Sequence, residues 1–152
     1  MFESIQTPSL LLDAEKLERN CATMRRRIEG HGVTLRPHVK TVKNIEAARV
    51  ALGAPSGPIA VSTVREAEYF FDHGFRDILY AVGMVPAKVA RLSELVRRGG
   101  RISVIVDSVE GARAHVAAIG KAGVAMPVKR QPRWLGASPT SITRACARRA
   151  SR

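Results

Sequence analysis

Residues 58–82 read PIAVSTVREAEYFFDHGFRDILYAV, and this stretch decides the fold. Two short runs of apolar and β-branched residues, 58–62 and 77–82, flank an amphipathic stretch over 64–73. Thr63 is suited to cap the start of a helix there, and Gly74 is suited to end it. A strand, a helix and a second strand in this order predict a βα unit of a parallel sheet.

The same alternation extends in both directions and covers residues 33–127. It repeats about every twenty to twenty-five residues, with glycines at several of the expected helix ends. Further strands are expected at 9–13, 33–39, 101–107 and from 126, and further helices at 14–30, 44–52, 86–98 and 109–121. The fold class is therefore α/β, a partial (β/α)8 barrel of four to five βα units, because a complete barrel usually needs about 250 residues.

The composition changes at Val128. Residues 129–152 contain seven Lys or Arg and no Asp or Glu, whereas residues 1–128 contain 18 basic and 13 acidic residues. The alternation of strands and helices stops at the same place. We expect residues 1–128 to form the partial barrel, and residues 129–152 to be a basic tail that is disordered or read out of frame after a frameshift.

The remaining composition is that of an ordinary globular protein, with 45% hydrophobic and 25% charged residues. No apolar run approaches the roughly 18 residues that cross a bilayer, and the first residues lack the features of a secretory signal. We therefore expect a cytoplasmic protein with no membrane partner. Cys21 and Cys146 indicate neither a disulfide framework nor a zinc cluster.

The densest chemical signal is LRPHVKTVK, residues 35–43. It places Lys40 at the end of an expected strand, where barrel enzymes carry their reactive groups. A partly desolvated lysine with cationic neighbours has a lowered pKa and can act as an imine-forming nucleophile. The candidate neighbours are Arg36, His38 and Lys43. On spacing alone, a solvated strand end and loop is the favoured interpretation.

Other charged residues near strand ends are expected to be structural. Arg65, Glu66 and Glu68 open the helix at 64–73, where acidic residues suit the positive end of the helix. Asp107 ends the expected strand 101–107 and is a candidate either to face the site or to cap the next helix. The other histidines lack metal-ligand spacing and are expected on the surface: His31, His73 and His115.

Five segments together resemble the D-serine dehydratase and D-threonine aldolase group. They are TPSLLLD (7–13), RPHVKT (36–41), VSTVREAEYF (61–70), DILYAVG (77–83) and VDS (106–108). The resemblance implies a barrel of the alanine racemase type that carries pyridoxal 5'-phosphate (PLP). Lys40 matches the lysine that forms the Schiff base with PLP, and His38, on the same strand face, is a candidate to contact the cofactor. Val42 stands where many members have a second histidine, which leaves the substrate open.

The resemblance also implies parts that do not follow Val128 in this sequence. These are an acidic Glu-x-Asp-x-Gly segment, a phosphate site on later strands, and metal ligands in a carboxyl-terminal β domain. We therefore expect a fragment of a PLP-dependent lyase that lacks the β domain, has no metal site, and shows little or no turnover. Its open sheet edge predicts poor solubility or a homodimer.

The favoured function is deamination of D-serine, or aldol cleavage of D-threonine and related D-3-hydroxy amino acids, with a D-amino acid as the small-molecule substrate. One alternative is a PLP-binding protein without catalysis, although TPSLLLD resembles the strand that joins the β domain in two-domain members. A second alternative, ranked last, is nucleic-acid binding through the basic tail. Racemisation and the oligomeric state stay open.

Overall fold

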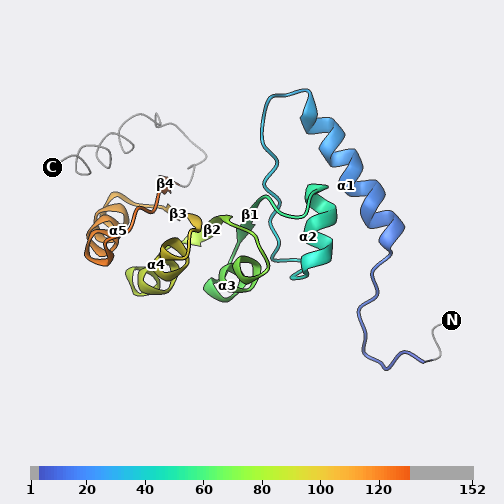
Figure 1. Cartoon of the computed structure of the whole chain (residues 1–152), viewed down its shortest axis with the longest axis horizontal. Helices are drawn as coiled ribbons and strands as arrows, with labels where there is room; N and C mark the ends of the chain where they lie inside the picture. Colours follow the sequence, from blue (N-terminus) through green and yellow to red (C-terminus); the bar gives the residue numbers. More distant parts are fainter. Residues whose placement is uncertain (1–3, 131–152) are drawn as a thin grey trace.

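The computed structural model describes residues 4–130, which form a four-stranded parallel sheet with a row of helices along one face (Figure 1). The strands lie in chain order: β1 (Pro58–Val61), β2 (Asp77–Gly83), β3 (Arg101–Val106) and β4 (Val128–Arg130). Each of the first three is followed by a helix, respectively α3 (Val64–Asp72), α4 (Val89–Arg97) and α5 (Val109–Ala122). Parallel neighbours in sequential order confirm the predicted βα units and the partial barrel.

The core lies between the sheet and the helices α3, α4 and α5. Because side chains alternate along a strand, one register row places Val61, Tyr80 and Val104 side by side, and all three are fully buried. Phe70 of α3 and Phe75 after it meet edge to face, with their ring centroids 5.4 Å apart. The opposite face of the sheet, which is the interior of a closed barrel, is less well covered: Leu79, Ala81 and Ile105 are half-buried there, although Ser103 is buried.

Two further helices lie beside the sheet, at the β1 end of the row (Figure 1). They are α1 (Ala14–Glu29) and α2 (Ile45–Leu52), which pack against each other. Asp13 and Asn44 cap their first turns, since each side chain accepts a hydrogen bond from a backbone N–H three residues later. Both helices were predicted, but α1 contributes no buried residue to the core.

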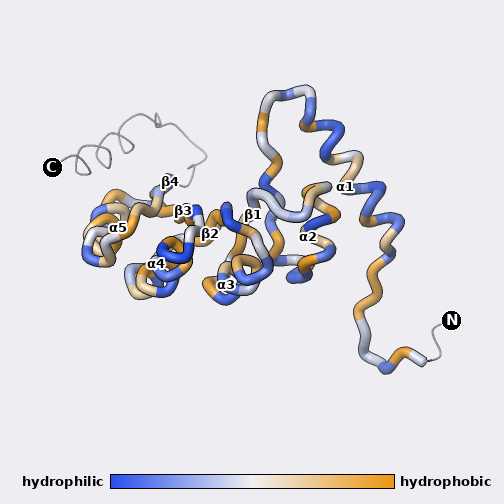
Figure 2. Tube along the Cα trace, viewed as in Figure 1, coloured by the Kyte–Doolittle hydropathy of each residue, from blue (hydrophilic) through white to orange (hydrophobic). Residues whose placement is uncertain are grey.

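The strand predicted at 9–13 is wrong. No regular structure forms there, and Leu10, Leu11 and Leu12 are all exposed, Leu10 completely. A strand needs a neighbour that can share its hydrogen bonds, and this apolar segment runs away from the described part of the sheet (Figure 2). The apolar residues of this segment predicted a strand, but no strand within residues 4–130 lies beside it to pair with.

The strand predicted at 33–39 is reduced to a single bridge between His38 and Ala60. Val39 N–H donates to Ala60 C=O, and Ala60 N–H donates to Pro37 C=O, each at 2.9 Å. The next two bonds toward the amino end of a parallel ladder would need N–H donors at Pro37 and Pro58, and proline has none. The two prolines therefore explain why this pairing stops after one bridge.

Side-chain caps start the helices that follow the strands. Thr63 and Glu66 form a capping box at α3, as the sequence predicted for Thr63. Ser108 caps α5 through Gly111 N–H, so the suggested capping role of Asp107 is wrong. The helix predicted over 86–98 begins with the 3-10 turn η1 (Pro86–Lys88), where Pro86 takes an early position that needs no N–H donor.

Two expectations concern the carboxyl end of the described region. β4 pairs with β3 through Val128, Lys129 and Arg130, so the last strand runs two residues past the expected end of the barrel segment. The basic tail from residue 131 onward lies outside the described residues. None of the helices within residues 4–130 has the length and apolar character needed to span a bilayer.

Candidate functional site

The turn that carries Lys40 is anchored to the sheet. Val39 is buried, and its carbonyl accepts a hydrogen bond of 2.9 Å from Lys43 N–H, which closes the turn over residues 39–43. Lys43 adopts a left-handed backbone conformation, with φ of 44°, which few residues other than glycine adopt. Lys40 itself is exposed and forms no ion pair with any residue in 4–130. The backbone of Lys40 is therefore held beside β1, and its side chain is accessible to solvent.

His38 connects this turn to β1. Its backbone bridges Ala60, while its half-buried ring contacts groups on both sides. Lys40 N–H donates to the ring nitrogen Nδ1 at 3.2 Å, and the other ring nitrogen, Nε2, lies 3.3 Å from the Ser62 hydroxyl oxygen. His38 and Lys40, the two predicted site residues, are thus neighbours. Ser62, the residue directly after β1, contacts the other side of the His38 ring.

Glu66 ties the end of β1 to the Lys40 turn. One carboxylate oxygen, Oε2, accepts hydrogen bonds from Ser62 N–H at 2.8 Å and Thr63 N–H at 3.2 Å. The other, Oε1, lies 3.6 Å from the ammonium nitrogen of Lys43. Glu66 is 8% exposed, so its charge is compensated at both oxygens rather than by bulk water. The structural role expected for Glu66 therefore includes holding the candidate site.

The electrostatic balance favours a neutral His38. Burial lowers the pKa of its imidazole below 6.5, and the positive charge of Lys40 lowers it further. The carboxylate of Glu66 acts in the opposite direction and raises it, but the sum is a lowered pKa. At neutral pH the ring is therefore uncharged and has one nitrogen that accepts and one that donates.

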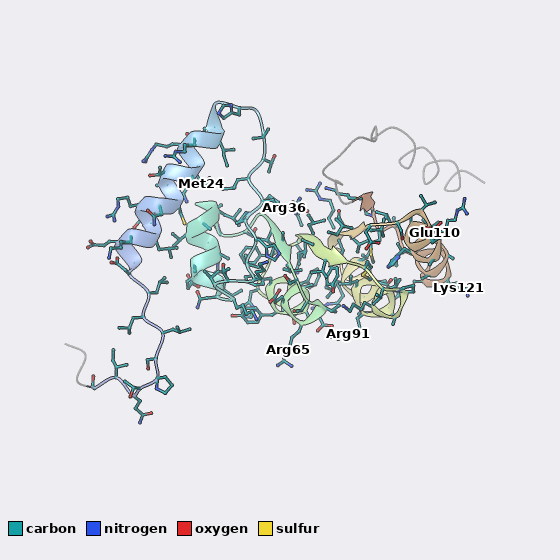
Figure 3. All side chains as sticks on the ribbon, turned by 180° about the vertical axis from the view of Figure 1, so that it is seen from behind. Met24, Arg36, Arg65, Arg91, Glu110 and Lys121 are labelled. Atoms are coloured by element: carbon teal, nitrogen blue, oxygen red, sulfur yellow. The ribbon has the colours of Figure 1, made fainter. Side chains whose placement is uncertain are left out.

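Arg36 does not belong to this site, although it was a predicted cationic neighbour of Lys40. Its guanidinium forms two contacts of 3.0 Å with the carboxylate of Asp77, the first residue of β2. Asp77 lies at the amino end of the sheet, whereas Lys40 lies toward the carboxyl ends of the strands. Arg36 lies close to β1, while Arg65 and Arg91 project from the outer side of the helices (Figure 3).

Asp107 and the three other histidines do not all lie where the sequence predicted. Asp107 is exposed just after β3. His31 and His73 are exposed as expected, but His115 is fully buried, so its expected surface position is wrong. It lies on the buried side of α5, three and four residues from Ala112 and Ile119. Within residues 4–130, no three His, Cys, Asp or Glu side chains gather in a group that could hold a metal ion.

The matching family model is the alanine racemase N-terminal domain, which covers residues 12–147. The parallel βα arrangement agrees with that domain. The chain therefore belongs to the alanine racemase N-terminal domain family.

Individual relatives are similar over most of this chain. The D-threo-3-hydroxyaspartate dehydratase of Delftia sp. (strain HT23) is 44% identical over 118 residues, which are 78% of this chain and 31% of the relative. The D-serine dehydratase of Dictyostelium discoideum is 32% identical over 138 residues, 88% of this chain and 34% of that protein. The chain thus spans about a third of the curated relatives it matches. These names confirm the predicted resemblance.

Solved structures agree with the sequence matches. The structure of the Delftia dehydratase superposes with a TM-score of 0.82 at 38% identity, and covers 95% of this chain and 40% of that one. The D-threonine aldolase from Filomicrobium marinum superposes with a TM-score of 0.77 at 30% identity, and covers 97% of this chain and 41% of that one. The fold of this chain therefore matches a part of each of these larger structures.

Proposed function

We propose that this chain supplies the amino-terminal barrel portion, centred on residues 1–128, of a PLP-dependent lyase that acts on D-amino acids. Within it, Lys40 is the residue that binds the cofactor covalently. The observation that carries the proposal is the position of Lys40, exposed at the end of the sheet in a turn anchored by Val39 and Lys43. The dehydratase and aldolase names of the relatives support the reaction class.

The residues at this site fit the aldehyde end of PLP. A covalent bond to the cofactor needs an accessible amine that is not engaged by a carboxylate, and Lys40 meets this condition among the described residues. The neighbouring Lys43 does not, because it is paired with Glu66. We assign His38 to the surroundings of the bound cofactor and name no described residue for its phosphate group.

The chemistry divides between cofactor and protein. PLP, when bound, supplies an electron sink that stabilises negative charge at the substrate Cα after a bond there is broken. The amine of Lys40 would also be the nearby group that could take or give a proton. The neutral ring of His38 keeps a second positive charge away from Lys40. D-serine and D-3-hydroxy amino acids are the proposed substrate class.

We expect the 152-residue chain to show little or no turnover by itself. Residues 4–130 provide four parallel strands and one bridge, whereas an eight-stranded barrel builds its active site from the loops of all eight strands. Cofactor attachment at Lys40 requires only the local turn. Attachment and turnover are therefore separate expectations.

The first experiment incubates the chain with PLP, reduces the adduct with borohydride, and locates the modified lysine by peptide mass spectrometry. Modification is expected at Lys40, and Lys40→Arg should abolish it. Lys43→Arg is the matched control, since it changes a lysine three residues away that is paired with Glu66. Modification spread evenly over the surface lysines, and unchanged in Lys40→Arg, contradicts the proposal.

The second experiment measures ammonia, 2-oxo acid and glycine released from D-serine, D-threonine and D-3-hydroxyaspartate. Little or no release is expected. Release that disappears in Lys40→Arg supports the lyase assignment but contradicts the expected inactivity. Release that persists in Lys40→Arg contradicts the role of Lys40.

A further inference from the structure

Ser62 and His38 meet because of the register between β1 and the segment before it. The single bridge pairs His38 with Ala60, and Ser62 lies two residues after Ala60, on the same face of the sheet. The hydroxyl oxygen of Ser62 is 3.3 Å from His38 Nε2, and the backbone of Ser62 is held by Glu66 at 2.8 Å. The hydroxyl is therefore presented to the ring from a constrained position.

The hydrogen bonds on the two sides of the ring determine its tautomer. A backbone N–H can only donate, so the bond from Lys40 N–H makes His38 Nδ1 an acceptor. In a neutral imidazole the proton must then reside on Nε2, which donates it to the Ser62 oxygen. The hydroxyl proton of Ser62 remains available for a further acceptor.

We propose that Ser62 is a positioning residue that acts on Lys40 through His38. Its oxygen accepts the Nε2 proton of His38 and so reinforces the tautomer in which Nδ1 accepts the Lys40 backbone N–H, the bond that helps to set the shape of the turn presenting the lysine. The effect on cofactor attachment rests on the function proposed above. The tautomer of His38 and the state of the Lys40 amide do not depend on that function.

The charged groups around the ring are consistent with this arrangement. Lys40 approaches from its own turn, and Glu66 approaches from α3 with Lys43 on its far oxygen. A second proton would have to bind to Nδ1, whose lone pair already accepts the hydrogen bond from Lys40 N–H. Protonation of His38 therefore breaks the bond that shapes the turn.

The test compares Ser62→Ala with Ser62→Thr, which keeps the hydroxyl, in the full chain without any cofactor. Imidazole 15N chemical shifts report which ring nitrogen is protonated, and amide hydrogen exchange reports the Lys40 N–H. The wild type and Ser62→Thr are expected to hold the Nε2–H tautomer. Ser62→Ala should populate both tautomers and speed exchange of the Lys40 amide about fivefold, the effect of losing one hydrogen bond of about 1 kcal/mol.

A second readout is the rate at which PLP attaches to Lys40, followed by absorbance. Ser62→Ala should slow it by about the same factor, and Ser62→Thr should restore it. An Nδ1–H tautomer in the wild type, or a tautomer and an exchange rate unchanged in Ser62→Ala, overturns the inference. Attachment of PLP at another lysine overturns the proposed function instead, and leaves the tautomer result standing.

Discussion

Arg36 and Asp77 join the segment before the sheet to the start of β2 through an ion pair in which one guanidinium nitrogen lies 3.0 Å from both oxygens of the carboxylate. The same guanidinium also donates to Ile59 C=O at 3.1 Å. Both side chains are largely buried, 24% and 16% exposed. This pair fixes the chain two residues before His38, so it constrains the candidate site from the opposite end of the sheet.

Replacing Asp77 by alanine should lower the free energy of unfolding by about 1.5–3 kcal/mol, because it leaves the largely buried Arg36 guanidinium without its charged acceptor. Urea denaturation checks this value. Asp72→Ala is the matched control, since its pair with Arg98 is about half exposed and should contribute at most about 1 kcal/mol. Equal losses in the two variants contradict the prediction.

The Asp77 pair should also be lost in acid. Burial alone raises the pKa of this carboxyl, but hydrogen bonds from Arg101 and Arg36 outweigh it and lower the pKa below 3.8. A carboxyl with a lowered pKa contributes stability above its unfolded value, and the contribution disappears as the pH falls through the folded value. The stability difference between wild type and Asp77→Asn should therefore be full at neutral pH and shrink below about pH 4. A difference that does not change with pH contradicts this assignment.

The titration of His38 should respond to its two charged neighbours in opposite directions. Its pKa lies below 6.5, so its contribution to stability is present above that value and is lost as the pH falls through the lowered pKa. Glu66→Gln should lower the pKa further, because it removes the charge that raises it, and Lys40→Met should raise it. NMR titration of the imidazole measures both. Glu68→Gln is the control, since Glu68 pairs with Arg91 instead, and should leave the curve unchanged.

The capping box at α3 should contribute measurably to folding. Thr63→Ala removes the oxygen that accepts the Glu66 N–H at 3.0 Å and should destabilise the chain by about 1 kcal/mol in urea denaturation. Thr63→Ser keeps that oxygen and should stay close to the wild type. A large loss in Thr63→Ser points instead to the Thr63 methyl group.

Much of the fold could be predicted because its signals are local. Thr63 and Gly74 lie just before and just after α3 in the sequence. The strand β3 is recognisable from its own run of β-branched residues at 101–107. The failures involve long-range partners. Residues 9–13 are apolar enough for a strand but have no described strand to pair with. Residues 33–39 form only one bridge to β1, because each of the two paired segments contains a proline that cannot donate a hydrogen bond.

The candidate site could be predicted only in part, for a similar reason. The position of Lys40 follows from the end of a strand, and His38 follows from the two-residue period. The roles of Ser62 and Glu66 depend on the pairing of His38 with Ala60, and this strand register could not be predicted from the sequence. Thr63 indicated the helix start, but the contact of Glu66 with Lys43 required the folded turn.

One of the two prolines that end the pairing of His38 with Ala60 also limits strand addition at the β1 side of the sheet. On the β1 side, Pro58 acts as a gatekeeper, since it can offer no N–H to a chain that pairs with β1 before Ala60. At the other side of the described sheet stands β4, whose three residues, Val128 to Arg130, include no proline. Strand addition on the β1 side of the described sheet is therefore disfavoured by the backbone itself, whatever side chains an incoming chain carries.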